Sequence, residues 1–241
     1  MGDNENRDQL SSQWREWRLH HGGGNARETA YEIIKDKIIS LDLKPGQHLS
    51  DKLLAEELNM SRTPVREALI ILSVSNMVVL KPQIGTFVAH IDVDRMEMEQ
   101  FSRYTMEKQI LSMACGKLSD EDKWHYEQNI QAYEHYMQLA PGNEKKLLEL
   151  DNEFHLIAFT AVGKGDDFFH MMERMQHIER MRMLSIMGVE NDSTLDDHSK
   201  IYRALAAGDR EQAQQVLDLH LNRYKENLEE VRRHFPEYFP D

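Results

Sequence analysis

Residues 49–72, LSDKLLAEELNMSRTPVREALIIL, constrain the fold of this chain more than any other stretch. Three leucines recur at helical spacing and predict a short first helix with one side facing a core: Leu53, Leu54 and Leu58. Asn59 and Met60 follow and predict a tight turn. A short helix, a turn and a second helix in this order predict a helix-turn-helix.

The second helix carries its own start signals. Ser61 stands where a helix N-cap accepts a hydrogen bond from a free backbone N–H. Pro64 falls in the first turn, where its missing N–H costs nothing. The buried stripe is expected to be Val65, Leu69 and Leu72, which leaves the other face to Arg62, Thr63 and Arg66. Cations at the start of such a helix are typical of a recognition helix in the DNA major groove.

A two-stranded wing is predicted directly after this helix. Residues 77–80 form a short apolar run, residues 81–83 turn the chain, and residues 85–89 read as the returning strand. Lys81, Gln83 and the flexible Gly85 are expected to approach the DNA backbone or minor groove. The alternative is a helix-turn-helix that serves only for packing, with a solvated arginine face. The turn, cap, arginines and wing occurring together in order favour DNA binding.

The run PGQHLSDKLLAEELNMSRTPVREAL, followed by GTFVA, resembles the DNA-binding domain of GntR-type bacterial transcription regulators over about residues 26–90. The resemblance implies DNA contacts from Lys52, Arg62, Thr63, Arg66 and Gly85, to which Ser61 and Lys81 are added as candidates. Position 52 is often arginine in that family. Lys52 is therefore expected to contact phosphate as a point charge rather than as a forked donor.

The net charge of −13 is unusual for a DNA-binding chain, and its distribution explains it. Residues 26–90 carry 8 basic and 8 acidic side chains, whereas residues 91–241 carry 18 basic and 30 acidic ones. DNA binding must therefore depend on a few placed cations, with a clear salt dependence. A single cysteine, Cys115, excludes an internal disulfide framework and fits a cytoplasmic protein. No apolar run reaches membrane-spanning length, so no membrane association is expected.

Three segments are expected. Residues 1–25 are polar, end in a glycine run and predict a flexible arm. Residues 26–90 predict the winged domain, and residues 91–241 an all-α bundle for ligand binding and dimerisation. The helices of the bundle are expected at about 92–117, 119–139, 143–163, 166–187, 194–207 and 209–234. The fold class is thus mainly α.

Four potential metal ligands lie in the helical part. Asp151 and His155 are four residues apart and share one helix face, while His198 and His220 lie on later helices. One carboxylate and three imidazoles suit Zn²⁺, Ni²⁺ or Mn²⁺. With 12 histidines in the chain, spacing alone favours the alternative of buried, hydrogen-bonded histidines.

DNEFH and the later run DHSKIYRALAAGDREQAQQVLDLH resemble the helical effector domain of the FadR-like branch of GntR regulators. That resemblance implies a metal held by Asp151, His155, His198 and His220. Two departures touch supporting positions: Asp197 stands where relatives usually have Glu, and an asparagine common after His155 is replaced in AVGKGDD. The resemblance also implies a cavity-facing arginine at Arg103, with Arg182 as a second effector-binding candidate. The alternative for Arg103 is a surface ion pair with Glu107.

The combined expectation is a homodimeric regulator, most simply a repressor, that binds a palindromic operator. Its DNA affinity would be controlled by a small organic acid bound near the metal. Three alternatives stay open: a metal sensor in which the ion is the signal, a metal-free acyl-ligand regulator, and a helical metallohydrolase. The last has no convincing general base in the sequence, so the chain is not expected to be an enzyme. The operator, the effector and the metal are not set by the sequence.

Overall fold

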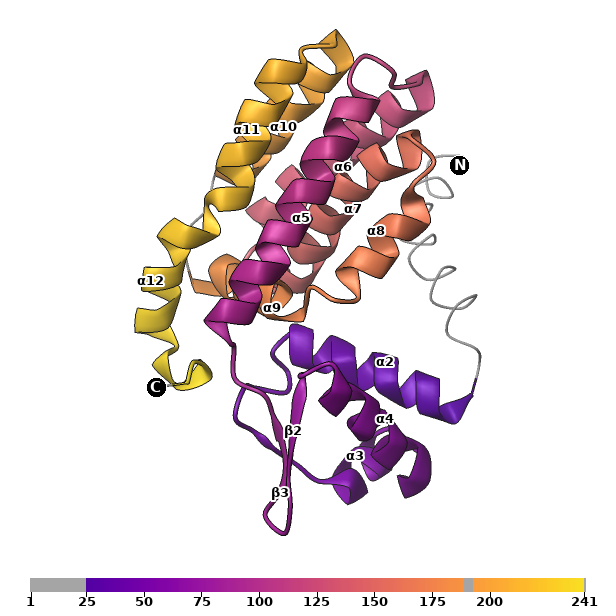
Figure 1. The fold of residues 1–241 in the computed structure, drawn as a ribbon, viewed down its shortest axis with the longest axis vertical. Coiled ribbons are helices and arrows are strands. Elements are labelled where there is room, and N and C mark those ends of the chain that lie inside the picture. Colours follow the sequence, from indigo (N-terminus) through magenta and orange to yellow (C-terminus); the bar gives the residue numbers. More distant parts are fainter. Residues whose placement is uncertain (1–24, 189–192, 241) are drawn as a thin grey trace. The chain divides into compact units, whose positions relative to one another are not determined.

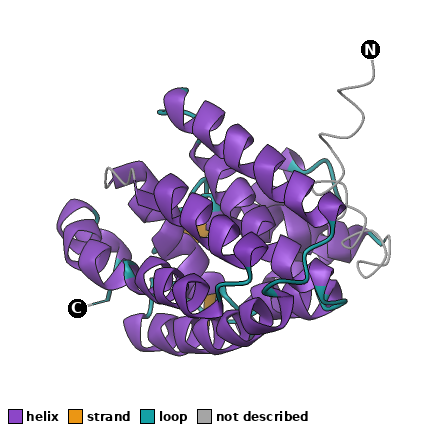
Figure 2. Ribbon diagram, turned by 90° about the horizontal axis from the view of Figure 1, so that it is seen from above, coloured by secondary structure: helices purple, strands orange, loops and turns teal. Residues whose placement is uncertain are grey.

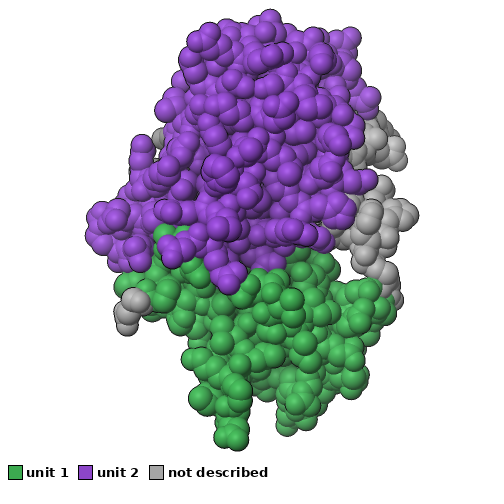
Figure 3. Space-filling model, in the orientation of Figure 1, with its two compact units in different colours: residues 1–93, 235–241 green, residues 94–234 purple. Residues whose placement is uncertain are grey.

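The structure, a computed structural model, describes residues 25–188 and 193–240. The expected arm at residues 1–25 therefore lies, except for Asn25, outside the described residues. The chain divides into two compact units, residues 1–93 with 235–241 and residues 94–234 (Figure 3). Helices make up most of the described chain (Figure 2), and none of them is long and apolar enough to cross a membrane.

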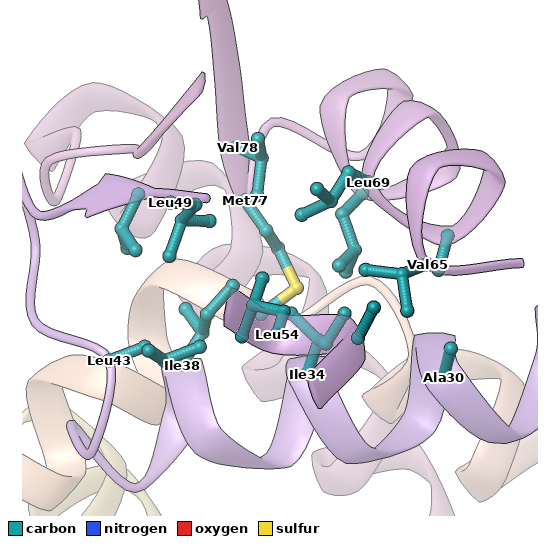
Figure 4. Packing of buried hydrophobic residues seen from close by; sticks show 14 residues of the cluster. Ala30, Ile34, Ile38, Leu43, Leu49, Leu54, Val65, Leu69, Met77 and Val78 are labelled. Carbon is teal, nitrogen blue, oxygen red and sulfur yellow. The ribbon is translucent and has the colours of Figure 1, made fainter. Parts of the chain in front are cut away.

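Unit 1 contains the predicted winged helix-turn-helix (Figure 1). Its elements, in chain order, are α2 (Ala26–Ile39), β1 (His48–Leu49), α3 (Asp51–Glu57), α4 (Arg62–Val74), β2 (Val78–Lys81), β3 (Gly85–Val88) and the 3-10 helix η1 (Pro236–Tyr238). Side chains from all three helices meet strand residues in one core (Figure 4), which includes Ile34, Leu54, Leu69, Met77 and Val78. The turn between α3 and α4 is closed by the Met60 N–H, which donates to the Ala55 carbonyl at 2.9 Å. Asn59 makes that turn with φ +52°.

The wing is a three-stranded sheet rather than the expected pair of strands. The strand order is β1-β3-β2, with both pairs antiparallel. Phe87 of β3 lies opposite Val79 on one side and His48 on the other. Two residues were too short a run for strand periodicity to reveal β1 in the sequence.

The last residues of the chain belong to unit 1, although the sequence division had assigned them to the helical domain. The Ile91 N–H donates to the Tyr238 carbonyl at 2.9 Å. Ile91, Tyr238 and Phe239 are all buried. The chain thus leaves unit 1 after Val93 and returns to it at Phe235.

Two expectations for the helix-turn-helix are wrong in detail. Leu53 was expected in the core, yet it is 63% exposed, because α3 turns Leu54 inward instead. Ser61 occupies the N-cap position of α4, but its side chain makes no capping hydrogen bond. Pro64, the third residue of α4, has no N–H to donate, which removes one of the two usual partners of such a cap.

Unit 2 is all helical. Its elements are α5 (Val93–Ala114), α6 (Asp120–Gln138), α7 (Glu144–Ala161), α8 (Gly165–Met172), α9 (Gln176–Gly188), α10 (Ser193–Ala207), α11 (Arg210–Asn222) and α12 (Tyr224–His234). Two expected helices are each divided in two. The helix expected at 166–187 is interrupted after Met172, and the one expected at 209–234 is interrupted at Arg223. Neither break coincides with a Gly or Pro, the residues that usually indicate the end of a helix in a sequence. The prediction of a mainly α chain with a small wing is confirmed.

Candidate metal centre and DNA-binding face

The four predicted ligands converge inside unit 2. Asp151 and His155 lie on α7, His198 on α10 and His220 near the end of α11. One ligand atom from each residue can be chosen so that all four lie within 4.8 Å of one another. The Nε2 atoms of His155 and His220 are 3.2 Å apart, and His198 Nε2 lies 3.1 Å from Asp151 Oδ1. Residues up to 69 positions apart are thus brought to one point.

Carboxylates behind the imidazoles set the orientation of two rings. Glu107 Oε2 on α5 lies 2.7 Å from His155 Nδ1, and Asp197 Oδ2 lies 3.4 Å from His220 Nδ1. A ring whose Nδ1–H faces a carboxylate keeps the lone pair of Nε2 for the centre, which is the arrangement that metal-bound histidines commonly use. Burial alone would raise the pKa of Glu107, but Arg103 and His155 lower it below its usual value.

His198 provides the strongest test of whether a metal fits. Its imidazole is fully buried and stacks on Phe154, with ring centroids 3.8 Å apart. Its Nδ1 has no hydrogen-bond partner among the described residues, and its Nε2 lies 3.1 Å from Asp151 Oδ1 without forming a hydrogen bond. A buried polar group without a partner costs free energy, and a metal–ligand bond at Nε2 would satisfy that nitrogen.

The imidazoles are neutral in this environment, as metal ligands must be. Burial lowers the pKa of His220 to about 4. Burial and the neighbouring His220 and His155 hold the pKa of His198 well below its usual range. Burial also lowers the pKa of His155. The donor set of one carboxylate and three neutral imidazoles therefore fits a borderline divalent cation.

Asp151 has a cationic partner of its own. The Arg182 guanidinium is in direct contact with Asp151 Oδ2 and also bonds Glu179, while its Nη1 donates to Asn152 Oδ1 at 2.7 Å. Burial and the nearby Arg103 charge hold the pKa of Arg182 well below its usual value. Burial raises the pKa of Glu179 to about 7. The candidate ligand carboxylate is thus neutralised by an arginine.

Arg103 makes the predicted ion pair with Glu107, but not at the surface. Its Nε donates to Glu107 Oε1 at 2.6 Å, and both side chains are almost completely buried. The i,i+4 ion pair considered for the surface therefore exists in the interior, where Glu107 also contacts His155 Nδ1. Arg103 Nη2 lies 3.9 Å from Asp151 Oδ2.

A cavity of about 80 Å³ opens beside the four ligands. Asp151 and His220 reach it from the candidate metal centre, and both effector candidates, Arg103 and Arg182, line it. Further polar residues at its wall were not singled out in the sequence; they include Gln100, Tyr133, Arg223 and Asn227. Two of these carried a usable signal, because Gln100 precedes Arg103 by three residues and Arg223 follows His220 by three. Such spacing places side chains on one helix face.

The candidate DNA contacts of unit 1 are largely exposed. Ser61, Arg62, Thr63 and Arg66 are exposed at the start of α4, and Lys52 is exposed on α3. Arg62 Nη2 makes two short contacts to the Asp51 carboxylate, at 2.8 and 2.9 Å. Lys52 lies 3.9 Å from Glu56, so its charge is only loosely paired.

The wing adds two further candidates. Lys81 is exposed, with its Nζ 5.2 Å from the centre of the Phe87 ring. Gly85 has φ +144°, and a Cβ there would lie 2.7 Å from His48 Nε2. His48 also packs edge-on against Phe87. The base of the wing therefore depends on the absence of a side chain at position 85.

Family comparisons agree with this architecture. The gntR family of bacterial regulatory proteins matches residues 26–88, and the FCD domain matches residues 99–223. The chain belongs to the gntR family and is a transcription regulator with a DNA-binding winged helix-turn-helix and an FCD effector domain.

Individual relatives extend over nearly the whole chain. An HTH-type transcriptional regulator from an unstable DNA locus of Streptomyces ambofaciens is 30% identical over 90% of this chain and 91% of its own. The HTH-type transcriptional repressor RspR of Escherichia coli K12 is 26% identical, covering 88% and 92%. The solved structure of E. coli McbR/YncC shares the fold, with a TM-score of 0.72, 19% identity and coverage of 88% and 99%. These relatives are regulators and not enzymes, which removes the metallohydrolase alternative.

Proposed function

We propose that this regulator is a repressor whose operator binding is controlled by a small organic acid bound beside a divalent metal ion. The metal ligands are Asp151, His155, His198 and His220, and the acid occupies the adjacent cavity. One observation carries the proposal. A fully buried imidazole that makes no hydrogen bond, His198, lies with its Nε2 3.1 Å from Asp151 Oδ1 in a cluster of four potential ligands, two of which border a cavity lined by arginines.

The charges of the cavity support an acidic ligand. When bound, a Zn²⁺, Ni²⁺ or Mn²⁺ ion would supply positive charge beside Asp151 and a coordination position for an acid oxygen. Arg103 and Arg182 line the same cavity and can donate hydrogen bonds to a carboxylate. The nearby acids Asp151, Glu107 and Asp197 are already matched by arginine or histidine partners. The cavity therefore favours an anion.

The DNA-binding part of the proposal uses Lys52, Ser61, Arg62, Thr63, Arg66, Lys81 and Gly85. Two chains would pair through residues 91–241 and place two α4 helices on the half-sites of a palindromic operator in the cytoplasm. The relative RspR is named a repressor, which supports repression over activation. Acid binding would change operator affinity by a coupling free energy of about 1–3 kcal/mol.

A second candidate is a regulator for which the metal itself is the signal. Its support is the contact between Arg182 and Asp151 Oδ2, since a metal bound through Asp151 Oδ1 would weaken the negative charge that this arginine pairs with. Metal binding alone would then change the partners of a buried arginine. An acid requirement for the change in operator binding separates the two functions.

The test combines thermal unfolding with operator binding. Purified protein is measured after chelation, after Zn²⁺, Ni²⁺ or Mn²⁺ is restored, and with organic acids in each state. We expect the metal to raise the unfolding temperature, an acid to raise it further only in the metal-loaded state, and His198→Ala to abolish both effects. His135→Ala, at an exposed histidine of α6, is the matched control and should keep both.

The possible results divide the candidates. A metal response without any acid response, together with metal-dependent operator binding, would favour the metal sensor. No metal response at all would contradict the four-ligand site and leave the metal-free regulator.

A further inference from the structure

We propose that the cavity selects hydroxycarboxylic acids over the matching keto acids, and that Gln100 makes the selection. This inference rests on the proposed function, because it specifies the acid that the same cavity binds. The ligand would present carboxylate oxygens to arginines and a hydroxyl hydrogen to the Gln100 side-chain oxygen.

The orientation of the Gln100 amide is set by a backbone carbonyl. Gln100 lies on α5 and is only 5% exposed. Its Nε2 donates to the carbonyl oxygen of Leu221, near the end of α11. A carbonyl can only accept a hydrogen bond, so the amide must turn its N–H₂ group toward Leu221. The Oε1 atom is thereby held as an acceptor on the other side.

That acceptor is unused within residues 25–188 and 193–240. Gln100 Oε1 is buried there without a hydrogen-bond partner, and Gln100 lines the cavity. A buried acceptor without a donor carries an uncompensated desolvation cost, which a ligand hydroxyl would remove. A ligand group that donates a hydrogen bond to Gln100 Oε1 is therefore favoured in this cavity.

Two arginines at the cavity favour ligand atoms that accept hydrogen bonds. In the same described part of the chain, Arg103 Nη2 and Arg223 Nη1 have no hydrogen-bond partner, and both residues line the cavity. Arg223 Nη2 is 2.7 Å from Asp197, and Arg182 is occupied by Asp151 and Glu179. Carboxylate oxygens match the free guanidinium nitrogens.

A hydroxy acid satisfies both demands, whereas a keto acid satisfies one. The keto oxygen of a keto acid has no hydrogen to donate. In the keto acid complex, this oxygen and Gln100 Oε1 would be two hydrogen-bond acceptors facing each other in a buried site. The cavity volume of about 80 Å³ restricts the choice to small acids, since it holds only a few waters. The selected class is therefore a small acid with at least one hydroxyl group.

The experiment is isothermal titration of the full-length, Zn²⁺-loaded protein with matched acid pairs. Suitable pairs are lactate and pyruvate, 3-hydroxybutyrate and acetoacetate, and 2-hydroxyglutarate and 2-oxoglutarate. In the pair that binds most tightly, we expect the hydroxy acid to bind at least about tenfold more tightly than its keto partner. Gln100→Met, which keeps the length of the side chain and removes the acceptor, should reduce the preference to about twofold or less. Gln109→Met, at an exposed position of the same helix, should leave it unchanged.

The outcomes separate this inference from the proposed function. Equal affinities, or a preference for the keto acid, would overturn the role of Gln100 and leave the acid-binding cavity standing. Failure of every acid to bind the Zn²⁺-loaded protein would overturn the acid-controlled function, and the inference with it. The comparison of paired acids on the unaltered protein decides the question even if Gln100→Met does not fold.

Discussion

Glu107 Oε2 lies 2.7 Å from His155 Nδ1, and the same carboxylate holds Arg103 through its other oxygen at 2.6 Å. One buried acid therefore supports both a candidate metal ligand and a candidate effector-binding arginine. This double contact connects the candidate metal centre to the cavity beside it.

The first prediction tests this support. Glu107→Gln removes the negative charge behind His155 while keeping the shape of the side chain. We expect the affinity for Zn²⁺ to fall about ten- to hundredfold, the range found when groups that orient metal-bound histidines are altered. Titration with Zn²⁺ against a competing chelator measures the change. Glu97→Gln, at an exposed position of the same helix, is the control and should retain the original affinity. An unaltered affinity in Glu107→Gln would mean that His155 does not depend on this partner.

The second prediction concerns pH. A proton and a metal compete for the same imidazole nitrogen, so metal affinity falls only below the pKa of the ligands. An ordinary histidine begins to lose its metal near pH 6.5. Here the pKa of His220 is lowered to about 4, and those of His155 and His198 are also lowered. The decline of Zn²⁺ affinity should therefore begin at a clearly lower pH than with ordinary histidines, and His220 should become protonated only near pH 4. A decline that already starts at pH 6.5 would contradict the burial argument.

The third prediction concerns the basic side chains of unit 1 that are candidate DNA contacts. Lys52→Ala and Arg66→Ala should each weaken DNA binding and reduce the slope of log affinity against log salt by about 1, since each removes one phosphate contact. Fluorescence anisotropy with the operator recovered by selection from random duplexes measures both quantities across a salt series. Lys117→Ala, at an exposed position in unit 2, should change neither. An unchanged slope for Arg66→Ala would assign that side chain to something other than phosphate.

The fourth prediction concerns the wing. Gly85→Ala places a Cβ at φ +144° and 2.7 Å from His48 Nε2, so we expect a loss of about 1–3 kcal/mol in the free energy of unfolding. Replacing His48 with Ser as well removes the collision but not the backbone strain. The double variant should therefore recover only part of the loss, as measured by denaturant unfolding. Complete recovery would show that the histidine contact, and not the backbone conformation, requires glycine.

The two-domain architecture and the residues that cluster at the candidate site were predicted better than the exposure of single side chains and the exact ends of the helices. The helix-turn-helix had several local signals in order, and residues such as Asn59 adopt the expected turn. The position of Leu53 was missed because Leu53 and Leu54 are neighbours at the start of a two-turn helix, and either one can pair with Leu58 to form a core face. The interruption at Arg223 was missed because no helix breaker marks it.

At the candidate site, contacts within one helix could be predicted from sequence spacing, whereas contacts between helices could not. Asp151 and His155 share a helix face, which spacing alone reveals, whereas their approach to His198 and His220 depends on the packing of α7, α10 and α11. The resemblance supplied that grouping. It did not supply Gln100, because the importance of its oxygen follows from the carbonyl of Leu221, 121 residues away along the chain.

The return of the chain to unit 1 at Phe235 has a mechanical consequence. The helical unit is connected to the DNA-binding unit at both of its ends, through the peptide that follows Val93 and the one that follows His234. A body held by a single linker can turn freely about it, whereas a body held at two points loses that torsional freedom. The hydrogen bond from Ile91 to Tyr238 fastens the two connections to each other. A displacement of the end of α12 relative to the start of α5 would therefore reach the DNA-binding unit through both connections instead of one.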